Sequence, residues 1–227
     1  MAVVAARDEE ERIGATVEAL RATFGQARIV VADSGSRDAT AARARAAGAE
    51  VVRPGRRGGK GAAMTAAAST VLDGARSGGT VILCDGDLGG SAARLGALAE
   101  AVESGRCDIA VAAFARKEGG GFGVAVGFAR WALHDLTGID LRAPISGQRA
   151  LRGELLPELL PFARGFGIEI GMTADAVGAG ARLEEVELDL EHRATRRTAA
   201  GFAHRARQLA AFVRVYAARR LRPRRSR

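Results

Sequence analysis

Two aspartates separated by one glycine follow the most apolar short segment of the sequence. The segment Thr80–Cys84 has the β-branched, apolar character of a buried strand, and Asp85-Gly86-Asp87 comes directly after it. Carboxylate oxygens are hard ligands that suit Mg²⁺ or Mn²⁺, and such an ion can neutralise the charge on a departing diphosphate. The alternative is a solvated turn, but the position after a buried strand favours a metal site.

Asp33 also follows a predicted strand, Arg28–Ala32. Its carboxylate can accept a hydrogen bond from the ring N–H of a nucleotide base. Uracil and guanine both present such a donor, so both bases stay open. Asp38 lies where the next helix begins, and we expect it to cap that helix.

Gly59-Lys60-Gly61 begins a third helix, where backbone N–H groups suit an anion. The segment does not fit the P-loop pattern, because only three residues separate Gly55 from Gly59 and Gly61 replaces the required Ser or Thr. We therefore expect Lys60 to contact a nucleotide directly.

Short apolar segments alternate with helical patterns through the first half of the chain. This alternation predicts an α/β fold with a mainly parallel sheet, in which ligands bind at the carboxyl ends of the strands. Three acidic segments then share one edge of the sheet: Arg7–Glu10, Asp33–Ser36 and Asp85–Asp87. The predicted strands are residues 2–6, 28–32, 51–52, 80–84 and 108–114, and the predicted helices begin near residues 13, 38 and 59.

The second half follows different patterns. Apolar and acidic residues alternate from Val186 to Leu190, which predicts a half-exposed antiparallel strand. Glycine-rich residues 119–127 lack the dinucleotide-binding spacing and are interpreted as a mobile acceptor-side loop. Amphipathic helices are expected through Trp131 and at 202–216. We expect one domain, residues 1–227, with a nucleotide-sugar half (1–115), an acceptor half (116–215) and a basic tail (216–227).

Composition narrows the function classes. The 227 residues are 48% hydrophobic and 26% charged, which excludes wholesale disorder. No apolar run approaches the length of a membrane span, and no secretory signal is recognised, so a cytoplasmic protein with two buried thiols, Cys84 and Cys107, is expected. The net charge of +8 comes largely from seven arginines in the last 14 residues. This tail could contact an anionic membrane surface or nucleic acid, or it could lie in solvent without a partner, and the last is the favoured interpretation.

Taken together, the motifs resemble those of the family-2-type glycosyltransferases of the GT-A fold, over nearly all of the chain up to about residue 210. The departures are Asp8 in place of Asn, Ser34 in place of Asp, and Ala5 in place of Pro. The segments that carry the resemblance are Val3–Glu10 (opening strand and Asn-Glu-Glu turn), Asp33–Thr40 (Asp-Asp-Gly-Ser-x-Asp-x-Thr), Gly59–Gly61, Asp85–Asp87 (metal motif) and Ser146–Arg152 (Ser-Gly-x-Arg-Ala-x-Arg).

Two branches of that family are considered. Gly165–Gly171 and Glu191-His192-Arg193 are more similar to the glucosyl-3-phosphoglycerate synthases than to the polyprenyl-phosphate sugar transferases, and Gly89 replaces a Gln frequent in the latter. In the first branch a histidine joins the second aspartate on the metal, which implies His192 beside Asp87. An exposed strand end is the alternative role for His192.

The implied site has four groups of residues. Arg149 and Arg152 are assigned to an anionic acceptor because guanidinium pairs bidentately with phosphate or carboxylate. The full assignment is nucleotide-sugar binding by Ala5, Arg7, Glu9, Asp33, Lys60, Asp85 and Gly86; metal binding by Asp85, Asp87 and His192; catalysis by Asp87 and Glu169; and acceptor binding by Gly147, Arg149 and Arg152.

The expected function is transfer of a sugar from a UDP- or GDP-sugar, with Mg²⁺ or Mn²⁺, to an anionic acceptor such as a phosphoglycerate or a polyprenyl phosphate. A sugar nucleotidyltransferase is the first alternative, but its triphosphate loop would be replaced here by the acidic segment Arg7–Glu11. A nucleic-acid-binding module is the second, and it lacks both a known motif and aromatic residues for stacking. Expected partners are therefore the donor, the acceptor, a membrane surface at the tail and a second copy of the chain, but no nucleic acid.

Overall fold

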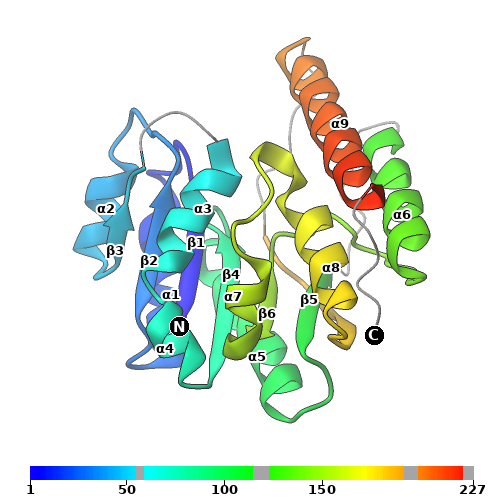
Figure 1. Ribbon diagram of the computed structural model, residues 1–227. Helices are drawn as coiled ribbons and strands as arrows, with labels where there is room; N and C mark the ends of the chain where they lie inside the picture. The colour runs from blue at the N-terminus through cyan, green and yellow to red at the C-terminus, as the bar shows by residue number, and fades with distance from the viewer. Residues whose placement is uncertain (55–58, 115–122, 192–198, 222–227) are drawn as a thin grey trace.

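The computed structural model describes residues 1–54, 59–114, 123–191 and 199–221. A central sheet lies between two layers of helices, with α1, α2 and α5 on one face and α3, α4, α7 and α8 on the other (Figure 1). Two apolar clusters fill the two interfaces between sheet and helices. This layered α/β arrangement is the one predicted from the alternating pattern.

The seven strands have the order β3-β2-β1-β4-β6-β5-β7. The first four in this order are mutually parallel, and β6 runs antiparallel to both β4 and β5. The strands are β1 (Ala2–Ala6), β2 (Ile29–Asp33), β3 (Glu50–Val52), β4 (Thr80–Asp85), β5 (Ile109–Phe114), β6 (Arg149–Arg152) and β7 (Leu183–Leu188).

The helices connect the strands and cover them. The α-helices are α1 (Ile13–Phe24), α2 (Thr40–Ala46), α3 (Gly59–Ser69), α4 (Leu72–Arg76), α5 (Gly96–Glu103), α6 (Val124–Thr137), α7 (Leu156–Leu159), α8 (Ile168–Gly178) and α9 (Ala199–Arg220), and the 3₁₀ helices are η1 (Gly89–Leu95), η2 (Gly153–Leu155) and η3 (Gly165–Gly167). Across the described ranges, no helix has both the length and the apolar character required to cross a membrane. Cys84 and Cys107 are buried free thiols, as predicted.

The prediction of an antiparallel strand near Val186–Leu190 is wrong. The strand is β7, and it pairs parallel with β5 from Ile109↔Leu183 to Phe114↔Leu188. An alternating pattern reports that one face of a strand is exposed, but it does not fix the direction of pairing. The antiparallel strand is β6, which is only four residues long and begins and ends with arginine.

The three acidic segments do share one edge of the sheet, as predicted. In the registers of β1, Ala6 lies beside Asp33 and Ala5 beside Asp85. The N–H of Ser34 donates to the carbonyl oxygen of Ala6 (3.0 Å), and the N–H of Gly86 donates to that of Ala5 (2.8 Å). The ladders of β1 with β2 and with β4 therefore continue to the point where the polar segments begin.

The start of α3, which carries Lys60, packs closely against residues 163–165. A Cβ atom added at Gly61 would lie 2.0 Å from the carbonyl oxygen of Ala163. A residue with any side chain at position 61 would therefore push α3 away from the segment that leads into α8.

We predict that Gly61→Ala destabilises the protein by about 1–3 kcal/mol, because the added methyl group meets backbone that cannot rotate away. The matched control is Gly14→Ala in α1, where nothing lies within 4 Å of the added Cβ. That change should be neutral or stabilising, since alanine favours a helix over glycine. Thermal unfolding of both variants measures the difference, and equal midpoints would contradict the packing described here.

Candidate active site

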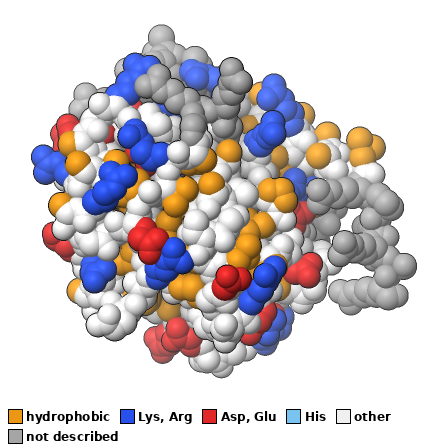
Figure 2. All heavy atoms as spheres, turned by 60° about the vertical axis from the view of Figure 1, so that its left-hand side comes forward, with side chains coloured by type: hydrophobic (Ala, Val, Ile, Leu, Met, Phe, Trp, Pro, Cys, Tyr) orange, Lys and Arg blue, Asp and Glu red, His pale blue; other side chains and the backbone are white. Residues whose placement is uncertain are grey.

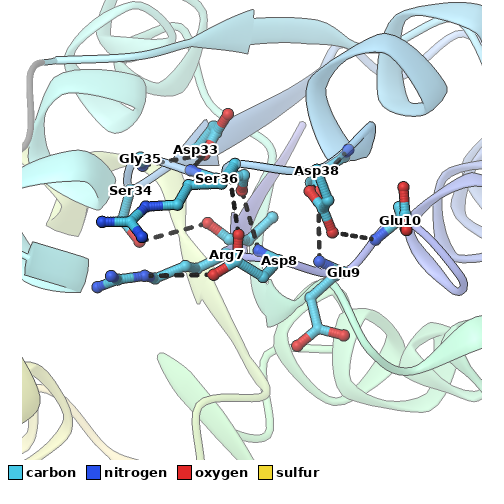
Figure 3. Close-up of polar contacts among 12 residues, drawn as sticks. Arg7, Asp8, Glu9, Glu10, Asp33, Ser34, Gly35, Ser36 and Asp38 are labelled. Atoms are coloured by element: carbon cyan, nitrogen blue, oxygen red, sulfur yellow. Dashed lines mark hydrogen bonds and ion pairs between the residues drawn. The ribbon is translucent and has the colours of Figure 1, made fainter.

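The turn after β1 and the loop after β2 are hydrogen bonded to each other (Figure 3). The N–H of Asp8 donates to Oγ of Ser36 (3.0 Å), and Oδ1 of Asp8 accepts from the N–H of Arg37 (2.8 Å). Asp8 has a left-handed backbone (φ 55°), which aspartate tolerates better than most residues. The N–H of Glu9 donates to Oγ1 of Thr40 (2.8 Å), so the backbone of this turn is fixed against the start of α2.

Glu10 and Asp38 form a second connection between the same segments. The N–H of Glu10 donates to Oδ2 of Asp38 (3.2 Å), and Oε2 of Glu10 accepts from the N–H of Ala39 (3.0 Å). The predicted cap residue is displaced by one position, because the N-cap of α2 is Ala39; Asp38 precedes it and accepts from the N–H of Thr40, the first residue of the helix. Desolvation opposes the charge on Asp38, but the hydrogen bonds from Thr40 and Glu10 outweigh it and lower the pKa of the carboxyl group.

Asp33 is buried at the end of β2. Its Oδ1 accepts from the N–H groups of Gly35 (3.0 Å) and Ser36 (2.8 Å), which fixes the carboxylate in one orientation. Its Oδ2 lies 2.8 Å from Nε of Arg53 in an ion pair that is not aligned as a hydrogen bond. A buried acceptor oxygen without a hydrogen bond is costly, so a ligand N–H at this position would be stabilising.

Lys60 connects two carboxylates that are far apart in sequence. Its Nζ donates to Oδ1 of Asp85 (2.7 Å) and to Oε1 of Glu169 (2.9 Å). Desolvation disfavours the charged amine, but the two carboxylates more than offset it and raise the pKa of Lys60 above its ordinary value. Lys60 is therefore a cation at neutral pH. Glu169 lies in the first turn of α8, where the helix dipole favours a carboxylate.

Asp85 is held on its other side by Gln148. The amide Nε2 of Gln148 donates to Oδ2 of Asp85 (3.1 Å), and the N–H of Asp85 donates to Oε1 of Gln148 (3.2 Å). Gly147 makes room for this contact, because a Cβ atom there would lie 2.7 Å from Oδ2 of Asp85 and 3.1 Å from Nζ of Lys60. Gly147, predicted to contact the acceptor, thus lies against the Lys60–Asp85 pair.

Gly86 and Asp87 turn the chain away from β4 and over α1. A Cβ atom at Gly86 would lie 3.0 Å from Cδ1 of Ile13, and the carbonyl oxygen of Gly86 accepts from Oγ1 of Thr16 (2.9 Å). The carbonyl oxygen of Asp87 accepts from Nη1 of Arg12 (3.1 Å). The backbone on both sides of the Asp87 side chain is therefore fixed.

The carboxylates of Asp85 and Asp87 suit a magnesium or manganese ion by their chemistry. A metal site in which the protein supplies most ligands needs at least three His, Cys, Asp or Glu side chains close together. No such group occurs within the described parts of the chain. Mg²⁺ beside a phosphate substrate is commonly held by only one or two carboxylates, with phosphate oxygens and water completing its shell. Asp87, with Asp85 beside it, fits this second kind of site.

Two of the three predicted acceptor residues, Arg149 and Arg152, are not part of this hydrogen-bonded cluster. Arg149 is 1% exposed, and its guanidinium donates to the carbonyl oxygen of Ser146 (3.0 Å) and to Oγ1 of Thr173 (2.8 Å). Burial lowers its pKa to about 10, although Glu169 and Glu185 favour the charge. As placed, Arg149 has no surface with which to contact an acceptor.

Arg152 lies at the opposite edge of the sheet. It pairs with Thr80 at the start of β4, about 16 Å of strand away from Asp85, and its side chain forms an ion pair with Asp108 (3.3 Å). The expected acceptor contact by Arg152 is therefore corrected, because the antiparallel direction of β6 carries this residue away from the site. His192 lies outside the described residues.

The remaining predicted residues lie at the expected edge. Ala5 ends the β1–β4 register, Arg7 is largely exposed beside Asp8, and the carboxylate of Glu9 points away from Asp38 in Figure 3. Three residues of the site are missing from the prediction: Arg12, Arg53 and Gln148. Gln148 could be found from its place beside Gly147, and Arg53 from its place after the third strand. Arg12 reaches the edge because α1 packs against η1, which follows Asp87 in the sequence.

Comparison with known proteins shows which family the chain belongs to. The glycosyl transferase family 2 profile matches residues 1–141. A sequence comparison with curated proteins gives no match.

Solved structures of glucosyl-3-phosphoglycerate synthase from Mycobacterium tuberculosis are similar over nearly the whole chain. The complex with Mn²⁺, UDP and phosphoglyceric acid has a TM-score of 0.78 at 26% identity and covers 98% of this chain and 78% of that one. The complex with Mn²⁺, UDP-glucose and phosphoglyceric acid has a TM-score of 0.74 at 28% identity, with 95% and 79% covered. The complex with Mg²⁺ and UDP has a TM-score of 0.77 at 26% identity, with 96% and 78% covered.

The profile match covers more than half of the chain. The chain belongs to glycosyl transferase family 2 and is a glycosyltransferase with a GT-A fold.

Proposed function

We propose that this glycosyltransferase transfers a sugar from a UDP-sugar to a small acceptor that carries a phosphate or carboxylate. The observation that carries the proposal is the cluster in which Lys60 bridges Asp85 and Glu169 at the sheet edge that also holds Asp33 and Asp87. Supporting it, similar structures hold UDP-glucose with Mn²⁺ and either phosphoglyceric acid or glycerol 3-phosphate.

Asp33 is the residue we assign to the base. Its Oδ2 is buried and accepts no hydrogen bond from the protein, while Oδ1 is fixed by two backbone N–H groups. The ring N–H of uracil would supply the missing donor. Arg53, 2.8 Å from Oδ2, would lie beside the bound base and could donate to one of its carbonyl oxygens.

Asp87 and Asp85 are the residues that would hold a divalent ion beside the diphosphate. The ion, when bound, supplies positive charge that stabilises the leaving nucleoside diphosphate. Lys60 holds Asp85 in place from one side and Gln148 holds it from the other. Arg12 fixes the backbone of Asp87. His192 is a further ligand implied by the resemblance.

In the transfer, the bond between the anomeric carbon and the diphosphate oxygen breaks, and an acceptor oxygen bonds to that carbon. We assign Glu169 to orient the sugar or the acceptor through a hydrogen bond from a hydroxyl group; in support, its Oε1 is anchored on Lys60 in the first turn of α8. An ionised phosphate acceptor needs no base, whereas a hydroxyl acceptor loses a proton in the transfer.

The nucleotidyltransferase alternative loses support in the structure. The carboxylates of Asp8 and Glu10 accept hydrogen bonds from backbone N–H groups of the 33–40 loop. Those N–H groups are therefore already occupied, and the turn after β1 presents acidic side chains where a triphosphate loop would present donors.

The donor is identified by thermal unfolding with UDP-, GDP- and dTDP-sugars, with and without Mn²⁺. We expect a UDP-sugar with Mn²⁺ at about 100 times its Kd to stabilise the fold by about 2.7 kcal/mol, which raises the midpoint by several degrees. A larger rise with a GDP-sugar than with any UDP-sugar would contradict the assignment of the base.

Asp87→Asn should lower metal-dependent turnover at least about 100-fold while leaving the midpoint of unfolding unchanged, because it removes a charged ligand and keeps the shape. The matched control is Asp73→Asn in α4, a fully exposed aspartate on the surface, which should retain full activity. Turnover is measured by release of the nucleoside diphosphate at saturating Mn²⁺. Unchanged turnover in Asp87→Asn would refute the proposed metal site.

Lys60→Met should abolish measurable donor binding and destabilise the fold by about 2–4 kcal/mol, because it leaves Asp85 and Glu169 facing each other without a cation. Like charges raise the pKa of carboxyl groups, so protonation relieves the repulsion in this variant. Its deficit in unfolding free energy should therefore shrink as the pH falls from 8 to 5. Urea unfolding at several pH values measures it, and a deficit independent of pH would contradict the bridging role.

A further inference from the structure

Helices α6 and α9 lie side by side and pack on α8 at one end of the molecule (Figure 1). Across the described residues, every large hydrophobic side chain that is exposed belongs to this pair or directly follows it. These are Val124 (62% exposed) and Trp131 (52%) on α6, Val213 (45%) on α9, and Leu221 (83%) after α9. We call the surface formed by these four residues and Tyr216 the α6–α9 face.

The aromatic side chains of this face are held in position. The ring of Trp131 lies 5.6 Å from that of Phe128 and 5.0 Å from that of Tyr216, measured between centroids. The hydroxyl of Tyr216 donates to Oδ2 of Asp135 (3.0 Å), which also forms an ion pair with Arg220 (3.2 Å). Trp131 is therefore a supported side chain that nevertheless leaves half of its surface in water.

The C-terminal part of the sequence, which includes α9, carries a high density of positive charge. No acidic residue follows Glu191, and the 36 residues after it contain 12 of the 34 basic residues. The first 191 residues have a net charge of −4. By contrast, the face of the molecule shown in Figure 2 carries basic and acidic side chains interspersed.

We propose that the α6–α9 face docks on an anionic lipid bilayer. Tryptophan and tyrosine prefer the headgroup level of a membrane, aliphatic side chains enter the acyl boundary, and arginines are attracted to anionic lipids. The face presents the aromatic and aliphatic side chains, and the sequence after Glu191, which includes α9, supplies the arginines. Because the aliphatic residues are few, the attachment is peripheral and depends on the arginines.

The charge also argues against the other occupants. A second copy docked face to face would bring together two α9 helices from the arginine-rich part of the sequence, and like charges repel. Nucleic acid would satisfy the arginines but leave Val124, Val213 and Leu221 without apolar contacts, since stacking on bases uses aromatic rings. An anionic bilayer satisfies both the charge and the apolar side chains.

Trp131 is the only tryptophan in the chain, so its fluorescence reports on this face alone. With vesicles of phosphatidylglycerol and phosphatidylcholine, we expect the emission to shift to shorter wavelength and to be quenched by brominated acyl chains. Vesicles of phosphatidylcholine alone should bind at least tenfold more weakly, and about 0.5 M salt should weaken binding to the anionic vesicles. Equal binding to both kinds of vesicle, or no shift of the emission, would overturn the proposal.

Two variants test the two parts of the face by co-sedimentation with vesicles. Val213→Glu should weaken binding at least tenfold, whereas the same charge change at an exposed position of α1, Ala22→Glu, should have a much smaller effect. Deletion of residues 222–227 removes four arginines and should also weaken binding at least tenfold, because each arginine near an anionic surface strengthens it about fivefold.

Sedimentation velocity and oligonucleotide binding complete the test. A dimer that shields Trp131 from an aqueous quencher would overturn the proposal in favour of a second copy. Tighter binding to oligonucleotides than to anionic vesicles, with Trp131 shielded, would overturn it in favour of nucleic acid. A monomer whose Trp131 responds only to anionic vesicles would support it.

Discussion

The contact between Lys60, Asp85 and Glu169 joins the parts of the molecule on which the site depends. Asp85 ends β4, and Lys60 and Glu169 lie in the first turns of α3 and α8, so one amine connects the parallel half of the sheet to the later helices. Burying the amine costs hydration, but two carboxylates at hydrogen-bonding distance more than compensate, and the pKa of Lys60 rises. Removing Lys60 would leave two partly buried carboxylates without their shared cation, and such losses are large.

Two glycines make this contact sterically feasible. Without a side chain at position 61, α3 approaches the carbonyl oxygen of Ala163 closely enough for Lys60 to reach Glu169. Without one at position 147, the chain entering β6 passes beside Asp85 and Lys60, so Gln148 can bond to the same carboxylate. The charged side chains of the site therefore come together because the backbone at Gly61 and Gly147 can approach its neighbours closely. This close approach offsets the conformational entropy that each glycine loses on folding.

The sequence predicts the parallel half of the fold well, because β1, β2 and β4 are buried on both faces and read as continuous apolar runs followed by polar turns. It predicts the later strands poorly. β6 is short and flanked by arginines, so its pattern resembles a loop, and its antiparallel direction decides that Arg152 lies far from Asp85. The burial of Arg149 is equally invisible in the sequence, since arginine is usually exposed. Motifs identify which residues belong to a site, but strand direction decides which of them reach it.

The sheet edge poses an electrostatic problem, because an anionic diphosphate must bind where carboxylates are concentrated. In the structure, most of these carboxylates already accept hydrogen bonds or form ion pairs. Asp8 and Glu10 accept backbone N–H groups, Asp33 is fixed by Gly35 and Ser36 beside Arg53, and Asp85 is shared between Lys60 and Gln148. Each of these bonds lowers the electrostatic cost of bringing a second anion to the edge. A divalent ion held by Asp87 and Asp85 would add positive charge at an edge whose other carboxylates are already engaged, and that charge would favour binding of the diphosphate. The same argument explains why cationic side chains, Arg12, Arg53 and Lys60, lie at an edge that the sequence alone describes as acidic.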